Sequence, residues 1–293
     1  MVTTSLRQSG RTLDQLAIII GAQRSGTTSL FTWLSQHPQV CPCRLNEVGF
    51  FSNDSVWAHG MQWYKDLFDW DAACHRIAID DSTNCSKLAL HPHAAGRIAE
   101  YAPAAKIIYS MRHPVARMES HYTHDLAKGW RDDGSTIPTG KYGDLLETSM
   151  YARQLQPYRD SFPEENILPL RFEELVSEPA TTLQRVCRFL EIDPSFTFRS
   201  LDKAHSSNAG RRPGELGYYV YRFRQYMPFW TYFTAHLPPK YANAVRRMFR
   251  RKNVTNRTFS PDRREAILEE LRNDLRRLRS DSGFDVSPWG IEI

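Results

Sequence analysis

The chain has 293 residues, which is long enough for one large α/β domain with a substantial core. Its 41% hydrophobic and 24% charged residues are typical of a globular protein, and no apolar stretch approaches the roughly 20 residues that cross a bilayer. The net charge of +5 favours anionic ligands but is too small to indicate a nucleic-acid partner, so none is expected.

Residues 1–15 are polar and are expected to form a flexible N-terminus ahead of a single domain over 16–293. They lack the apolar core of a signal peptide, so we expect neither a signal peptide nor a membrane anchor there. The five cysteines are an odd number and lack the spacing of zinc sites. Free thiols and a cytoplasmic location are the expectation that follows.

Apolar runs alternate with helical patterns along the chain. The expected strands are 16–21, 76–80, 106–111 and 167–171. The expected helices are 27–36, 91–101, 114–126, 145–158, 180–190, 218–233, 238–252 and a last helix that begins at Pro261 behind the capping residue Ser260. This alternation predicts a P-loop-like three-layer α/β/α fold with a central parallel sheet. The Gly- and Asp-rich stretches 128–143 and 202–217 are predicted lid loops.

The segment 18–29, with the sequence IIIGAQRSGTTS, is the most informative part of the chain. Gly21 and Gly26 have the spacing of the phosphate-binding loop G-x-x-x-x-G-K-[ST], between an apolar run and a helical stretch. Thr27 stands where that loop has its lysine, and Arg24 is the cation of the loop. N–H groups at a helix start favour an anion. The segment therefore predicts a phosphate site that does not serve the γ-phosphate of ATP.

A second candidate phosphate site begins at Arg112, where the expected strand 106–111 ends. Pro114 suits the first position of a new helix, and Arg117 and Ser120 share one face of it. Arg112 and Ser120 are candidates to bind a second phosphate. The alternative, at even odds from these residues alone, is an arginine that ends a strand and a serine on a solvated face.

Together these segments resemble the PAPS-dependent sulfotransferases. Gly21–Ser29 resembles their 5′-phosphosulfate loop, and Arg112–Tyr122 resembles their 3′-phosphate motif R-D-P-x-x-R-x-x-S-x-Y. Asn46–Phe51 is similar to the K/N-E-x-H-F-F segment of heparan-type enzymes, and Asp80–Cys85 to their E-K-[ST]-P-x-Y segment. Arg24 in place of lysine is typical of the bacterial, carbohydrate and tyrosylprotein branches. Residues 271–289 resemble the end of bacterial members, so the resemblance covers nearly the whole chain from Leu16.

The resemblance implies a role for each matching residue. Arg24 would contact the bridging oxygen and the leaving 5′-phosphate. Arg112 and Ser120 would bind the 3′-phosphate, and Glu47 would be the general base. The remaining nucleotide contacts implied are Ser25, Gly26, Thr27, Thr28, Ser29 and, on a basic loop that closes over the nucleotide, Arg211 and Arg212.

The chain departs from the family pattern at four positions. His113 replaces the aspartate of R-D-P, and Gly49 replaces the histidine of E-x-H-F-F. Asp81 replaces the lysine of E-K-[ST], and Cys85 replaces its tyrosine. In heparan-type enzymes that lysine helps hold the substrate or the sulfonate. Its absence argues against a polyanionic glycosaminoglycan as the acceptor.

The resemblance implies in-line transfer of a sulfuryl group from the co-substrate PAPS to an acceptor hydroxyl, with PAP as the product. This group carries less charge than a γ-phosphate, so no metal is expected. A guanidinium and helix N–H groups would stabilise the charge that grows on the leaving phosphate. Phe50 and Phe51 suggest that the chain after Glu47 enters the core, which favours a general base over a solvent-facing carboxylate. The expected acceptor contacts are Ser82, Phe51 and His124.

Two other functions stay open at this point. A P-loop kinase or ATPase would use Asp80, after an apolar run, to hold Mg²⁺, although Thr27 at the lysine position argues against it. A non-catalytic nucleotide-binding module would bind PAPS without turnover. The acceptor itself is a carbohydrate, a glycolipid or a hydroxylated small metabolite. The basic cluster within 246–252 reads first as a solvated helix face, with an acidic carrier protein or a membrane surface as the sharper alternative.

Overall fold

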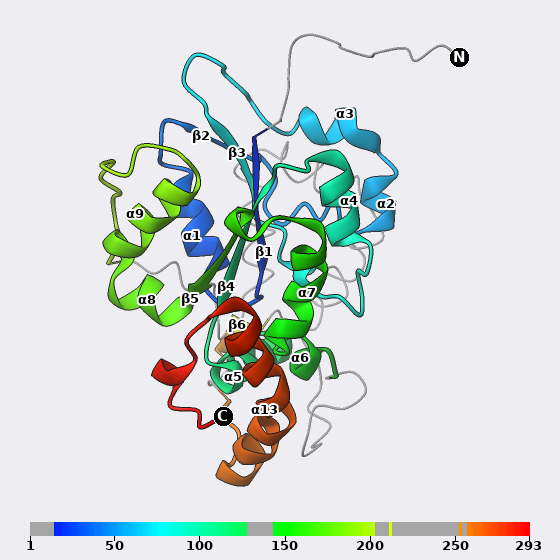
Figure 1. Ribbon diagram of the computed structural model, residues 1–293, viewed down its shortest axis with the longest axis vertical. Coiled ribbons are helices and arrows are strands. Elements are labelled where there is room, and N and C mark those ends of the chain that lie inside the picture. The colour runs from blue at the N-terminus through cyan, green and yellow to red at the C-terminus, as the bar shows by residue number, and fades with distance from the viewer. Residues whose placement is uncertain (1–14, 128–142, 203–210, 213–251, 254–256) are drawn as a thin grey trace.

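The computed structural model describes residues 15–127, 143–202, 211–212, 252–253 and 257–293 (Figure 1). Its centre is a five-stranded sheet in the order β2-β3-β1-β4-β5, in which every neighbouring pair is parallel. The strands are β1 (Leu16–Gly21), β2 (Val40–Pro42), β3 (Ile77–Asp80), β4 (Lys106–Met111) and β5 (Ile167–Arg171). The predicted parallel sheet is confirmed, with β2 added at one edge.

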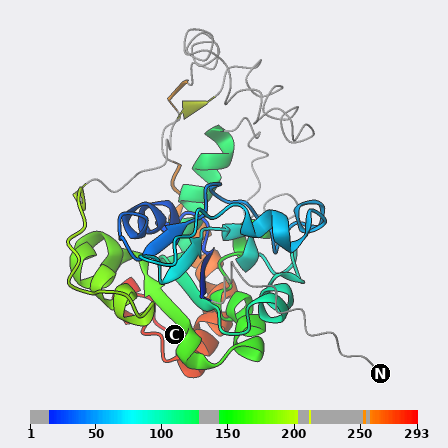
Figure 2. The same cartoon turned by 90° about the horizontal axis from the view of Figure 1, so that it is seen from above.

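Helices cover both faces of the sheet, which confirms the three-layer arrangement (Figures 1 and 2). β1 is buried along its whole length, and so reads as a continuous apolar run. Ala17 and Ile19 pack in one core cluster, and Leu16, Ile18 and Ile20 in another. The first cluster is completed by α1 (Thr27–Leu34), α8 (Phe172–Ser177) and α9 (Pro179–Phe189). The second is completed by α3 (Gly60–Lys65), α4 (Ala94–Tyr101), α5 (Pro114–Ala127), α7 (Tyr151–Ser161) and α13 (Pro261–Ser282).

The helix expected over 145–158 is two helices, α6 (Gly143–Glu147) and α7. The Leu145 carbonyl, which a continuous helix would pair with a later N–H, accepts hydrogen bonds from the Arg117 guanidinium and from the Ser149 hydroxyl. The N–H of Ser149 instead donates to Leu146, a tighter turn that ends the helix. A buried arginine thus sets the break. The short helices α2 (Asp54–Trp57), α3 and α8 were not predicted.

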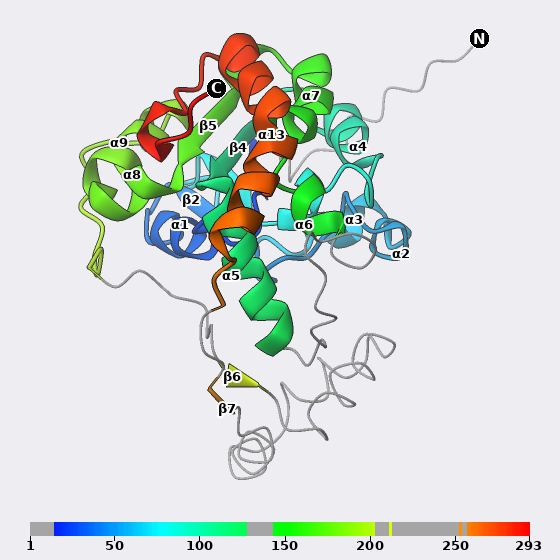
Figure 3. The ribbon, with the colours of Figure 1, turned by 90° about the horizontal axis from the view of Figure 1, so that it is seen from below.

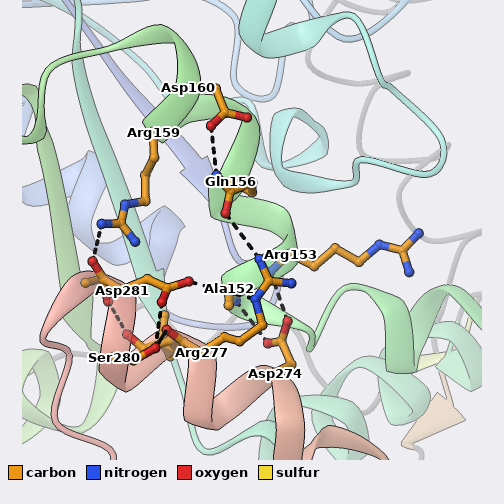
Figure 4. Close-up of polar contacts among 11 residues, drawn as sticks. Ala152, Arg153, Gln156, Arg159, Asp160, Asp274, Arg277, Ser280 and Asp281 are labelled. Atoms are coloured by element: carbon orange, nitrogen blue, oxygen red, sulfur yellow. Dashed lines mark hydrogen bonds and ion pairs between the residues drawn. The ribbon is translucent and has the colours of Figure 1, made fainter.

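The last helix follows its sequence signals closely. The Ser260 hydroxyl accepts from the Arg263 N–H, Pro261 opens α13, and the stripe Ile267, Leu271, Leu275 and Leu278 is buried. α13 runs along α5 and α7 (Figure 3). Both carboxylate oxygens of Asp274 accept backbone N–H groups at the start of α7, from Ala152 and Arg153, at 3.0 and 2.9 Å (Figure 4). The segment around Asp274 therefore joins α13 to the start of α7, which is a structural role.

Short elements complete the described chain. They are the 3₁₀ turns over Thr83–Ser86, Glu164–Asn166 and Ser287–Trp289 and the antiparallel pair β6 (Arg211–Arg212) and β7 (Lys252–Asn253). The expected helices 218–233 and 238–252, most of both predicted lid loops and all but Lys252 of the basic cluster lie outside the described residues. Within the described ranges, no helix combines the length and the apolar character needed to cross a membrane.

Candidate active site

The loop between β1 and α1 ends at Gly26, which caps α1 in the left-handed conformation with φ 79°. A Cβ at this position would lie 2.8 Å from a Phe172 ring carbon, so only glycine fits. The Leu30 N–H donates to the Gly26 carbonyl as the first turn closes. The N–H groups of residues 27–29 precede that bond and lack a helical acceptor. Such N–H groups and the helix dipole favour an anion, so this geometry is compatible with the predicted phosphate site.

The end of β4 fixes the conformation of this loop. The Ala22 N–H donates to the Ser110 carbonyl, and the Ser110 hydroxyl donates to the Ser25 carbonyl, both at 2.7 Å. Arg117, which is fully buried on α5, donates to the Gln23 carbonyl at 3.3 Å. Arg117 therefore supports the loop from within. The Ser25 hydroxyl is buried and, in the described part of the chain, has no hydrogen-bond partner, which leaves it available to a bound phosphate.

Arg24 joins the two predicted phosphate sites. Its Nε donates to the Ser120 hydroxyl at 3.1 Å, although the family resemblance assigns these two residues to different phosphates. Burial lowers the pKa of Arg24 most, and the positive charge of Arg112 lowers it further. The carboxylates of Asp125 and Glu47 oppose this change. Arg24 thus lies within electrostatic reach of a second cation and of the candidate base, where a bound anion would relieve the repulsion between the two arginines.

Arg112 follows β4, and its guanidinium carbon lies 4.8 Å from the centre of the Phe172 ring. Burial lowers the pKa of Arg112, and the Glu173 carboxylate opposes this. The departure at His113 leaves the local structure intact. The His113 Nδ1 accepts the Ala116 N–H at 3.4 Å at the start of α5, the place where an aspartate would cap the helix. Burial lowers the pKa of His113, which favours the neutral ring that can accept this bond.

Glu47 is exposed on the loop after β2 and has a left-handed φ of 50°. Its N–H donates to Asp81 Oδ1 at 3.0 Å. Two residues later the Gly49 N–H donates to the Ser82 hydroxyl, also at 3.0 Å, and that hydroxyl donates to Asp80 Oδ1 at 2.9 Å. The end of β3 therefore holds the backbone on either side of Glu47.

Asp80 and Asp81 are buried carboxyl groups. Burial raises the pKa of Asp80 to about 6, against hydrogen bonds from the Ser82 and Tyr64 hydroxyls. Burial raises the pKa of Asp81 to about 7, against the bond from the Glu47 N–H, and the charge of Asp80 adds to the rise. Asp80 was expected only as the Mg²⁺ ligand of the kinase alternative and Asp81 only as a departure from the family lysine, so neither was among the predicted site residues. Two acids directly after a buried strand were the available signal.

The three predicted acceptor residues differ in burial and in the contacts that they make. Phe51 is fully buried, and its ring meets Phe50 edge-on at 5.1 Å, so Phe51 belongs to the aromatic core rather than to an acceptor surface. The inward course of the chain at Phe50 and Phe51 agrees with the expectation that it enters the core after Glu47, whereas the expected acceptor contact of Phe51 does not fit this burial. Ser82 is also buried and holds the Gly49 N–H. His124 is half-buried, one helical turn after Ser120.

The predicted lid residues lie on β6, whose backbone contacts α5, the helix that carries Ser120 (Figure 3). The backbone of Arg211 and Arg212 is thus on the side of the molecule where the nucleotide motif lies. Across the ranges that the structure covers, no group of three or more His, Cys, Asp and Glu side chains is arranged to hold a metal ion.

The fold and the loop define a P-loop-like α/β protein with paired cations beyond the carboxyl ends of β1 and β4. A sequence model described as "Sulfotransferase family" matches residues 62–196. Mouse heparan sulfate glucosamine 3-O-sulfotransferase 5 is 28% identical over 219 residues, which are 71% of this chain and 59% of that protein. Human heparan sulfate glucosamine 3-O-sulfotransferase 3A1 is 31% identical over 237 residues, which are 72% of this chain and 54% of that protein. Residues 62–196 therefore carry the sequence pattern of the sulfotransferase family, and the chain is similar to members of that family over about 70% of its length.

The crystal structure of a sulfotransferase from Alicyclobacillus acidocaldarius has the same fold. It superposes with a TM-score of 0.64 at 21% identity, over 93% of this chain and 97% of that one. The present chain spans a little over half the length of the two curated relatives described above.

Proposed function

We propose that the chain is a PAPS-dependent sulfotransferase that transfers a sulfuryl group to an acceptor hydroxyl, with Glu47 as the general base. The observation that carries the proposal is the position of Arg24. It follows β1, donates to Ser120 of the 3′-phosphate motif, and is close enough to Arg112 and Glu47 for both to shift its pKa. A phosphate loop, a second phosphate motif and a carboxylate thus meet at one edge of the sheet, where α/β proteins bind ligands.

PAPS, when bound, supplies a sulfuryl group attached to a phosphate that leaves. The N–H groups at the start of α1 and the Arg24 guanidinium would stabilise the charge that develops on that phosphate. The Ser25 hydroxyl, buried and without a partner among the described residues, adds a donor to the same loop. Arg112 and Ser120 would bind the 3′-phosphate. A kinase-type lysine is not needed in this arrangement.

Glu47 is the carboxylate that would take the proton of the attacking hydroxyl. It is exposed and therefore open to an acceptor, while its backbone is held by the end of β3. Positioned general bases of this kind contribute on the order of 10²–10⁴ in rate. His124, half-buried on α5 beyond Ser120, remains a candidate acceptor contact.

The acceptor that suits this site carries little negative charge. The curated relatives are named for heparan sulfate, a sulfated polymer, but here Asp80 and Asp81 stand behind the candidate base. Glu47 and these carboxyl groups would repel a polyanionic acceptor, and position 81 has no lysine to offset that repulsion. We therefore favour a hydroxyl on an uncharged carbohydrate, a glycolipid or a small metabolite. The five free cysteines support a cytoplasmic location for the reaction.

The bonds of Asp80 weigh against a kinase or ATPase. One carboxylate oxygen accepts from the Tyr64 hydroxyl and the other from the Ser82 hydroxyl, so both oxygens already have partners within the protein. Its raised pKa also disfavours the charged form that would bind Mg²⁺.

The test combines binding and turnover. Calorimetry with PAP should show one site, and a screen of hydroxyl acceptors with radiolabelled PAPS should give a sulfated product. On the acceptor found, Glu47→Gln should lower kcat at least about 100-fold while PAP affinity stays within about threefold. Magnesium-dependent ATP turnover without PAP binding would overturn the proposal. PAP binding with no acceptor turned over, and with no effect of Glu47→Gln in any assay, would make the chain a nucleotide-binding module.

A further inference from the structure

The contact between Glu47 and the end of β3 bears on how the candidate base is held. Glu47 is not glycine, yet its φ is 50°, a conformation that side chains with a Cβ avoid. Its carboxylate side chain is exposed, so packing does not hold it there. What fixes the backbone is the bond from the Glu47 N–H to Asp81 Oδ1, at 3.0 Å between residues 34 positions apart. The bond from the Gly49 N–H to Ser82 is a second anchor.

We propose that Asp81 is the positioning residue of the candidate base: its carboxylate accepts the Glu47 N–H and so holds Glu47 in its left-handed conformation. This inference rests on the proposed function, and it gives a role to the residue that replaces the family lysine. A lysine has no acceptor atom and could not make this bond. A lysine at this position therefore cannot hold the base in the way that Asp81 does.

The charge on Asp81 should matter as well as its shape. A hydrogen bond to an ionised carboxylate is roughly twice as strong as one to a neutral acceptor. The ionisable groups around Asp81 are Asp80 at the end of β3, Cys43 after β2, and Glu47 itself. Burial raises the pKa of Asp81 to about 7, and the charges of Asp80 and Glu47 act in the same direction. The anchor therefore strengthens as pH rises through neutrality, and kcat should rise with it.

The first experiment is a double-mutant cycle on the holo reaction with labelled PAPS. Asp81→Ala should lower kcat about 10- to 100-fold in the wild-type chain, because a displaced catalytic group can cost that much. In the Glu47→Gln background the same change should lower kcat less than about twofold, since the group that Asp81 positions no longer works. The KM for PAPS should stay the same in both backgrounds, because the carboxylate of Asp81 holds the Glu47 loop by its hydrogen bond.

The second experiment separates charge from shape. Asp81→Asn keeps an acceptor oxygen but cannot ionise, so the midpoint of the acid limb of kcat should fall by at least about one pH unit. Asp274→Asn is the matched control. Asp274 is a half-buried carboxylate whose pKa, like that of Asp81, is raised by burial. It also accepts backbone N–H groups, but it does so at α7 (Figure 4). This control should change stability and leave the pH profile of kcat unchanged.

The outcomes separate this inference from the function on which it rests. If Asp81→Ala keeps kcat within about twofold, or lowers it equally in both Glu47 backgrounds, Asp81 does not position the base. If Asp274→Asn shifts the acid limb as much as Asp81→Asn, the shift reports folding rather than the base. If Glu47→Gln itself turns over normally, the base assignment fails first. Thermal unfolding of each variant shows that losses of kcat occur in folded protein.

Discussion

The two halves of the site differ in charge and in how closely they follow the family pattern. The β1–β4 half is cationic, with Arg24 and Arg112 near one another, and it matches both nucleotide motifs. The β2–β3 half is acidic, with Asp81 held against the Glu47 backbone, and it departs from the pattern at Asp81. Both halves lie beyond the carboxyl ends of one parallel sheet. Under the proposed function, the nucleotide constrains the cationic half, whereas the acceptor constrains the acidic half.

The largest expected effect is on the cationic half. Arg24→Ala should lower kcat on the identified acceptor by about 10²–10³, because a preorganised donor to the leaving group is lost. Labelled PAPS turnover measures it. The control is Arg272→Ala, at a partly exposed arginine of α13 that pairs with Glu269, and it should stay at the wild-type rate. A kcat within tenfold of wild type would remove Arg24 from the leaving-group site and leave the cationic half a binding surface only.

Arg112 and Arg117 make a sharper test within the same half. Arg112→Ala should weaken PAP binding about 10- to 100-fold with little change in melting temperature, because Arg112 is half-buried with its guanidinium over Phe172. Arg117→Ala should instead unfold the protein more easily, by about 3 kcal/mol or more. It would strip hydrogen bonds from Ser149, Leu145 and Gln23 inside the protein.

Calorimetry with PAP and thermal unfolding, both run on each variant, distinguish these two roles. The two variants could lose PAP affinity in the same proportion to their loss of melting temperature. That result would mean that Arg112 has only a structural role. In that case no residue directly after β4 would be left to bind the 3′-phosphate.

The acidic half should show its charge in the pH dependence of stability. The pKa of Asp81 rises from 3.8 to about 7 on folding, so the folded protein binds its proton more tightly. The contribution of Asp81 to stability is therefore full below about pH 4 and is lost as pH rises through about 7. Asp81→Asn has no such proton to lose, so above pH 7 it should be more stable than wild type by about 1–3 kcal/mol.

Urea unfolding at pH 5 and pH 8 measures this difference. The gain should be larger at pH 8. A gain that is equal at both values would mean that Asp81 ionises as freely as in the unfolded chain, and a gain larger at pH 5 would also contradict a raised pKa. Greater stability together with lower kcat in the same variant would be the pattern of a group kept for function at a cost in stability.

The sequence predicts the nucleotide half better than the acceptor half for a physical reason. β1 is a continuous apolar run that ends at Gly21, and β4 is a mostly apolar run that ends at Met111, directly before Arg112. The bounds of both strands follow from local pattern alone. β2 has three residues and includes a proline, too few for any periodic signal. Local spacing also locates the phosphate loop, because its conformation is set by Gly26 and the helix that follows.

What could not be predicted depends on contacts between distant segments. Arg24 and Ser120 are 96 positions apart, and motif matching places them on separate phosphates. The raised pKa of Asp81 comes from burial, which no spacing in the sequence reports. For Phe51 the sequence supported both an acceptor contact and a place in the core, and its complete burial agrees with the second.

The smallest expected effect concerns His113, where the cationic half departs from the family pattern. His113→Asp restores the family residue, and the new carboxylate could accept the Ala116 N–H that the imidazole accepts now. An acid at the start of α5 also interacts well with the helix dipole, but Glu173 lies beside it and repels it. These effects nearly cancel, so we expect a change in stability below about 1 kcal/mol and PAP affinity within about threefold of wild type. Calorimetry and thermal unfolding measure both. A tenfold change in PAP affinity would show that position 113 tunes Arg112, and that the cationic half, like the acidic half, has been adapted in this chain.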